Sequence, residues 1–173
     1  EVPFTRELYI DADDFAETPP PKFFRLKQKG EVRLMGAYIV KCGTIIKNPD
    51  GTVREIHCTA DLETGNGMPS DGRKIKGTIH WLSADYAKDT TLVLYDYLFT
   101  LENVADIPEG KTYDDYINPE SAVRVEHAKI EPSLAEAVPG DKFQFVRTGY
   151  FAVDTKNKNT FHRIVGLKDG YKA

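Results

Sequence analysis

A series of short runs rich in valine, isoleucine, threonine, tyrosine and phenylalanine constrains the fold of this chain more than any other feature. Turn-forming glycine, proline, asparagine and aspartate separate the runs, and no stretch keeps an apolar 3.6-residue period beyond ~12 residues. Long helices are therefore not expected, and short helical turns are predicted only at 13–16, 113–117 and 133–137. Strands are predicted at 6–11, 23–28, 31–41, 43–47, 53–61, 74–82, 91–99, 122–130, 142–153 and 160–167.

The best-specified hairpin surrounds the sequence Asn48-Pro49-Asp50-Gly51. Proline presets its own φ for the first corner of a turn, and glycine accepts a positive φ at the bulge that follows. A three-residue loop pairs Asn48 with Thr52, and burial of one apolar face selects the register. This register predicts the pairs Ile46 with Arg54, Thr44 with Ile56, Cys42 with Cys58, Val40 with Ala60 and Tyr38 with Leu62, with both cysteines in the core as free thiols.

Many short strands, together with two long exposed loops at 63–72 and 103–112, predict an all-β protein. The 173 residues suffice for two small lobes, each a closed or half-closed barrel. We place the first β-barrel region at 1–76 and the second at 77–173. An alternative is that the first and last strands share one barrel.

Composition excludes several classes of protein. A hydrophobic fraction of 40% and a charged fraction of 29% predict a buried core rather than disorder. No apolar run approaches the ~20 residues of a membrane-spanning helix, and no signal peptide is present. Because the chain does not begin with methionine, we expect a segment of a longer cytoplasmic protein. The two cysteines lack zinc-finger spacing, so neither a disulfide scaffold nor a metal site is expected.

Charge is distributed unevenly along the chain. A net charge of −4 argues against a general nucleic-acid binder. Five cations nevertheless fall within twelve residues and are opposed only by Glu31. On residue types alone, they form either a solvated surface or a stripe that follows a phosphate backbone. These cations are Lys22, Arg25, Lys27, Lys29 and Arg33.

Several motifs occur in one order over nearly the whole chain. Phe24-Arg25-Leu26 is followed by Glu31-Val32-Arg33-Leu34, and later by Gly77-Thr78-Ile79-His80-Trp81-Leu82-Ser83-Ala84. The last is Phe143-Gln144-Phe145-Val146-Arg147-Thr148-Gly149-Tyr150-Phe151. Together they resemble the C-terminal anticodon-binding region of bacterial-type glutaminyl-tRNA synthetases. The resemblance implies two consecutive β-barrels, related to a ribosomal-protein barrel, that clasp the anticodon loop and splay its bases apart.

The resemblance also implies what this chain lacks. The family's catalytic half carries a His-x-Gly-His element and a Lys-Met-Ser-Lys-Ser-like loop, and neither occurs here. The parent would be a class I glutamine–tRNA ligase, but this region should be inactive, with no catalytic residue and no metal. ATP and glutamine would bind the catalytic domain, so no cofactor is expected. The expected partner is the anticodon loop of glutamine tRNA, bound by a monomer with no membrane contact.

The first group of site residues follows from the motif around Arg25. RNA loops are read through unstacked bases, and a guanidinium can make two parallel bonds to a guanine edge, which lysine cannot. Glutamine anticodons end in guanine, so the resemblance assigns Arg25 to the third base. Arg33 is the candidate for the first anticodon position or its phosphate. Lys22 and Lys27 would attract phosphates without regard to sequence.

The second group lies in the Phe-Gln-Phe-x-Arg motif. By the resemblance, Gln144 and Arg147 read the central uracil, to which an amide can both donate and accept. Residues three apart in a regular strand point to opposite faces, so the strand must end, twist or bulge between them. The pair Thr148-Gly149 would permit this. Arg163 is a candidate for a backbone contact.

Other functions are left open by the residues. One is a protein with a related barrel that binds ribosomal RNA, and another is a protein-interaction module that uses an open sheet edge. An independent enzyme is the weakest reading, because no motif supports a nucleophile–base pair. Whether the parent also accepts glutamate tRNA is not decided.

Overall fold

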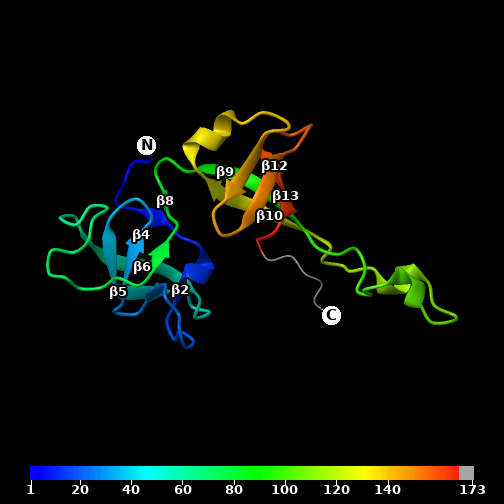
Figure 1. Ribbon diagram of the computed structural model, residues 1–173, viewed down its shortest axis with the longest axis horizontal. Helices are drawn as coiled ribbons and strands as arrows, with labels where there is room; N and C mark the ends of the chain where they lie inside the picture. Colours follow the sequence, from blue (N-terminus) through cyan, green and yellow to red (C-terminus); the bar gives the residue numbers. More distant parts are fainter. Residues whose placement is uncertain (168–173) are drawn as a thin grey trace. The chain divides into compact units, whose positions relative to one another are not determined.

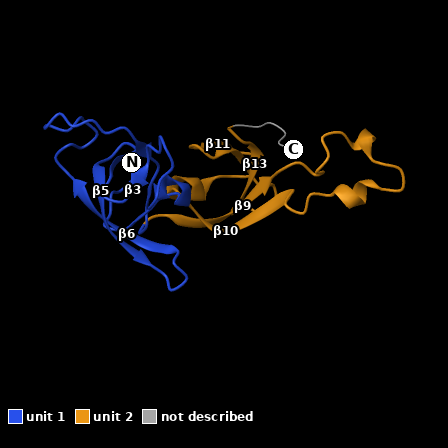
Figure 2. Ribbon diagram, turned by 90° about the horizontal axis from the view of Figure 1, so that it is seen from below, with its two compact units in different colours: residues 1–85 blue, residues 86–173 orange. Residues whose placement is uncertain are grey.

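A computed structural model of the chain, in which residues 1–167 are described, contains two compact units (Figure 2). The first unit is Glu1–Asp85, and the second begins at Tyr86. The predicted boundary at residue 76 was therefore wrong. Strand β7 (Thr78–Ile79) pairs with β4, and β8 (Leu82–Ser83) pairs with β1, so backbone hydrogen bonds hold both strands in the first unit.

The first unit is built from short strands around one core (Figure 1). Its largest sheet has four strands in the order β6-β5-β4-β7. Two further two-stranded sheets, β1-β8 and β2-β3, belong to the same unit. The remaining elements are β1 (Leu8–Tyr9), the 3-10 turn η1 (Ala12–Asp14), β2 (Phe15–Ala16), β3 (Leu26–Lys27), β4 (Glu31–Leu34), β5 (Ile39–Lys47) and β6 (Val53–Asp61).

The hairpin of β5 and β6 confirms part of the predicted register and corrects the rest. Cys42 lies opposite Cys58 and Val40 opposite Ala60, as predicted. Nearer the turn the register shifts twice, so Ile45 rather than Thr44 faces Ile56, and Ile46 faces Glu55 rather than Arg54. Each shift places an extra residue on one strand, which is a β-bulge. The first bulge places both Ile45 and Ile56 against the core. A strictly alternating strand pattern does not predict this pair.

The core of the first unit is apolar and includes the only tryptophan in the sequence. Trp81 is buried, and its indole Nε1 donates to the carbonyl of Met35 at 2.9 Å. Cys42 is a buried free thiol, but the free thiol of Cys58 is exposed, which corrects the prediction that both lie in the core. The core residues are Leu26, Val32, Leu34, Val40, Cys42, Ile79 and Trp81.

The second unit is a five-stranded sheet in the order β10-β9-β13-β12-β11, in which β13 and β9 run parallel. The alternative that the first and last strands share a barrel was wrong, because β13 pairs with β9 and β12 whereas β1 pairs with β8. The elements are β9 (Lys88–Tyr95), η2 (Val104–Asp106), η3 (Tyr113–Tyr116), β10 (Ala122–Ile130), η4 (Pro132–Glu136), β11 (Lys142–Phe145), β12 (Gly149–Val153) and β13 (Thr160–Val165).

Aromatic side chains fill the core of the second unit. Phe151 and Phe161 are fully buried, and the ring of Phe145 stacks on that of Phe151 with centroids 4.4 Å apart. Between β9 and β10, residues 96–121 extend away from the sheet and carry η2 and η3 (Figure 1).

The structure confirms the all-β class and shows small barrel-like units, with 3-10 turns near all three predicted positions. A fourth turn, η2 (Val104–Asp106), lies in the segment predicted to be a loop. Several predicted strands are shorter or divided. The run 31–41 is split after Leu34 by a turn in which Gly36 has φ 67°, and the run 142–153 is split after Phe145. Within residues 1–167, no helix has the length and apolar character needed to span a bilayer.

Candidate nucleic-acid interface

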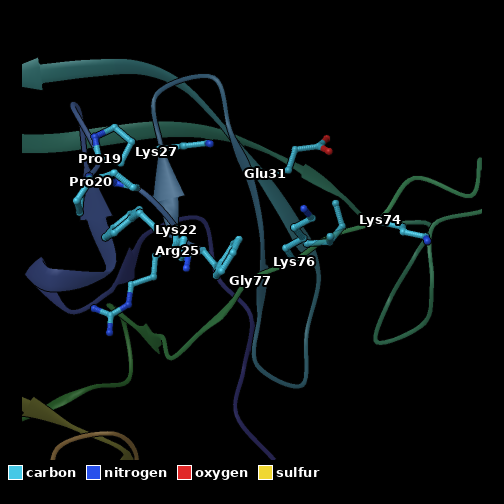
Figure 3. A pocket seen from close by; sticks show the side chains of 13 residues that line it. Pro19, Pro20, Lys22, Arg25, Lys27, Glu31, Lys74, Lys76 and Gly77 are labelled. Atoms are coloured by element: carbon cyan, nitrogen blue, oxygen red, sulfur yellow. The ribbon is translucent and has the colours of Figure 1, made fainter.

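An open groove of about 660 Å³ lies in the first unit (Figure 3). Its wall is formed by the proline connector 19–21, the segment that enters β3, and the segment that precedes β7. We call it the basic groove, because five of its lining side chains are cationic and one is acidic. The charged residues are Lys22, Arg25, Lys27, Lys74, Lys76 and Glu31.

Close backbone packing shapes this groove. Gly77 is buried directly against the carbonyl of Phe24, where an added Cβ would lie 1.9 Å from the carbonyl oxygen. The ammonium of Lys76 lies 5.9 Å from the centre of the exposed Phe24 ring, within the range of a cation–π contact. The groove therefore combines positive charge with a solvent-facing aromatic ring.

Arg25 lines the groove but is also part of an internal ion pair. Its Nε lies 3.2 Å from a carboxylate oxygen of Asp14, which is almost fully buried, and its guanidinium donates to the carbonyl of Asp13 at 2.7 Å. These contacts fix the orientation of the guanidinium and compensate the charge of Asp14. The role of Arg25 in reading a base stays a prediction.

The structure separates Arg33 from the other predicted residues of the first unit. Its guanidinium donates to the carbonyls of Gly65 and Gly67, both in the long loop after β6, and it does not line the groove. Lys22 and Lys27 do lie in the groove with Arg25. Sequence reasoning had missed Lys74 and Lys76, although two lysines at alternate positions just before Gly77 are a signal for a basic strip on one face.

In the second unit, Gln144 and Arg147 flank a strand end. Gln144 is exposed on β11, where it faces Tyr150 of β12. The strand ends at Phe145, and Arg147 lies in the following turn with φ 70°. Side chains alternate between the two faces only within a strand, and Arg147 lies beyond the end of β11. Its side chain is therefore not forced onto the face opposite that of Gln144.

Arg163 of β13 makes internal contacts with β9 and beside the end of this turn. Its Nη2 donates to the carbonyl of Tyr95 at 3.1 Å, and its stem packs against Gly149, which ends the turn. We therefore expect Arg163 to hold the turn more than to contact RNA.

The neighbouring His162 joins a chain of polar contacts. Its Nε2 lies 2.7 Å from Asp154, and its Nδ1 lies 2.8 Å from the hydroxyl of Tyr95. The backbone N–H groups of Lys156 and Asn157 also donate to Asp154. Those two backbone bonds, followed by the contact with His162, lower the pKa of Asp154 to about 2.

This low pKa predicts a loss of stability in acid. An unfolded aspartate titrates near pH 3.8, so the stabilisation is present above that pH and is lost as pH falls from about 4 to about 2. In Asp154→Asn, we expect stability to fall less steeply across this window than in the wild type. Urea unfolding at pH 6 and pH 3, followed by circular dichroism, measures the difference. The exposed carboxylate of Asp106, changed to asparagine, is the control and should leave the wild-type slope intact.

The chain is similar to known proteins over nearly its whole length. Two family models, both described as the anticodon-binding domain of class I tRNA synthetases (E and Q), match residues 1–61 and 78–154. Glutamine–tRNA ligases are 47% identical in Rhodopirellula baltica, 48% in Xanthomonas axonopodis pv. citri and 44% in Pseudomonas putida, in each case over 98% of this chain. The chain spans 28% to 30% of the length of these relatives. The two matches together cover most of the chain, and the chain belongs to the anticodon-binding domains of the class I tRNA synthetases for glutamate and glutamine.

Proposed function

We propose that this chain recognises the anticodon loop of glutamine tRNA on behalf of a glutamine–tRNA ligase. The basic groove is the observation that carries the proposal, since it gathers five cationic side chains and an exposed aromatic ring in one part of the first unit. Single-stranded RNA is held by such a combination, in which cations attract the backbone and aromatic rings stack on bases.

Within the groove, the proposed roles follow from side-chain chemistry. Lys22, Lys27, Lys74 and Lys76 attract phosphates, which positions the RNA without reading its sequence. Arg25, already oriented by Asp14, presents the rest of its fork to the third anticodon base.

The second unit supplies the proposed reader of the central base. The amide of Gln144 can donate to and accept from a uracil edge, and Arg147 on the adjacent turn can approach the same base from the strand end. The turn geometry supports this pairing, because a regular strand would have turned the two side chains apart.

The activity of the whole protein is also a proposal. We infer that the parent attaches glutamine to tRNA in an ATP-dependent reaction, in the part of its relatives that this chain does not span. ATP and glutamine would bind there, and no cofactor is proposed for this chain. We further propose a monomeric, cytoplasmic protein.

Binding of transcribed glutamine tRNA to this chain tests the proposal. Affinity should fall as salt rises, and a changed central anticodon base should weaken it. Arg147→Ala should cost about 1–3 kcal/mol on the cognate tRNA and little on the tRNA with the changed base. Arg124→Ala, an exposed arginine on β10 in the same unit, is the matched control and should change neither affinity by more than about twofold.

Two results would contradict this scheme in different ways. If changing the central base leaves affinity unaltered, recognition of the anticodon is wrong. If Arg147→Ala weakens both RNAs equally, Arg147 contacts phosphate rather than the base. Tighter binding to ribosomal RNA than to tRNA would favour the alternative of a ribosomal-RNA-binding barrel.

A further inference from the structure

The basic groove contains one carboxylate, that of Glu31, and an arginine outside the groove is bonded to it. The Nε of Arg73 lies 3.2 Å from Glu31, while its two terminal nitrogens lie 2.6 Å from Asp71 and 2.5 Å from Asp61. One guanidinium therefore serves three carboxylates that come from different parts of the first unit.

The position of Arg73 in the chain connects this cluster to the groove wall. Glu31 begins β4 and Asp61 ends β6, so the arginine joins the loop after β6 to two strands of the sheet. Lys74 and Lys76 follow it directly and line the groove. Contacts that hold Arg73 in place therefore also anchor the start of the segment that carries these two lysines.

The chemistry of the cluster requires arginine. Guanidinium presents five N–H donors in a rigid fork and stays charged at all relevant pH, whereas an ammonium is a single point charge. Bonds from Arg73 lower the pKa values of both Asp61 and Asp71. Without Arg73, three carboxylates would lose their shared partner, and Glu31 would repel phosphates that enter the groove.

We propose that Arg73 is a positioning residue for RNA binding, which neutralises Glu31 and fixes Lys74 and Lys76 without touching the RNA itself. The inference rests on the proposed function and extends it to a residue outside the groove. Figure 3 shows Glu31 among the cationic side chains of the groove. Without Arg73, the negative charge of Glu31 would weaken the attraction of these cations for phosphate.

The test measures affinity for glutamine tRNA in a cycle of variants. Arg73→Gln should weaken binding by about five- to tenfold at low salt, and Arg73→Lys by less. Adding Glu31→Gln to Arg73→Gln should recover most of the loss, because the anion that Arg73 no longer neutralises is removed. Glu31→Gln alone should change affinity by less than about twofold, since Arg73 already neutralises that carboxylate. Arg54→Gln, an exposed arginine of β6 paired with Glu55, is the control for loss of one charge and should have little effect.

The outcomes separate this inference from the function on which it rests. No tRNA binding by the wild type would overturn both. Binding by the wild type that Arg73→Gln leaves unchanged would overturn this inference alone. A loss that Glu31→Gln fails to recover would overturn neutralisation of Glu31 as the cause of the weaker binding. If Arg73→Gln fails to fold, a markedly tighter complex with Glu31→Gln alone would still refute neutralisation, and an unchanged one would support it.

Discussion

Replacing Gly77 with alanine should destabilise the first unit by about 3 kcal/mol or more. The new Cβ would lie 1.9 Å from the carbonyl oxygen of Phe24 and 3.1 Å from a methyl group of Val32. Backbone cannot retreat easily here, because the carbonyl of Gly77 accepts the N–H of Arg33 at 3.0 Å. The melting temperature of this unit should fall by roughly 12 °C or more.

Trp81 provides the measurement for Gly77→Ala. It is the only tryptophan in the sequence and lies in the core of the first unit, so its fluorescence reports the unfolding of that unit. Gly36→Ala is the control: its φ of 67° disfavours alanine by about 1–2 kcal/mol, but no atom lies within 4 Å of the added Cβ. Equal losses in the two variants would contradict the expectation, because they would show that the close packing at Gly77 costs no more than the backbone strain at Gly36.

Removing the side chain of Arg25 should lower both RNA affinity and stability. In Arg25→Ala, the carboxylate of Asp14 stays almost fully buried without its arginine, and we expect a loss of about 3 kcal/mol in the free energy of unfolding. The value lies at the low end for a broken buried pair, because the arginine itself is 37% exposed. Urea unfolding followed by Trp81 fluorescence measures the loss.

Two further variants separate the roles of Arg25. Arg54→Ala, which breaks an exposed pair with Glu55, should cost no more than about 1 kcal/mol. Combining Arg25→Ala with Asp14→Asn should restore part of the stability, because the buried negative charge that Arg25 had balanced is gone, without restoring RNA affinity. A variant Arg25→Ala that loses only RNA affinity would contradict the structural role of the ion pair.

The hairpin of β5 and β6 shows how far local sequence reaches. Proline, aspartate and glycine at 49–51 predict the turn, and the structure confirms the Cys42–Cys58 and Val40–Ala60 pairs. The two bulges nearer the turn were not predictable from alternation. The first bulge packs Ile45 and Ile56 against a core assembled from distant segments.

The candidate site, too, was predictable from the sequence only in part. The cluster of cations at 22–27 and the motif around Gln144 were visible as residue types in order. What each guanidinium bonds to was not, since Arg25 meets Asp14, Arg33 meets a loop after β6, and Arg163 meets the carbonyl of Tyr95. None of those partners is adjacent in sequence.

By itself, the sequence determined the all-β class, the turns, the two lobes and the family, because strand periodicity, turn residues and ordered motifs are local properties of the chain. Only the tertiary structure decided where the first unit ends, which lysines complete the groove, and which arginines are engaged in internal contacts. The physical reason is that hydrogen bonds and ion pairs depend on atoms within about 3 Å, and folding brings those atoms together from segments far apart along the chain.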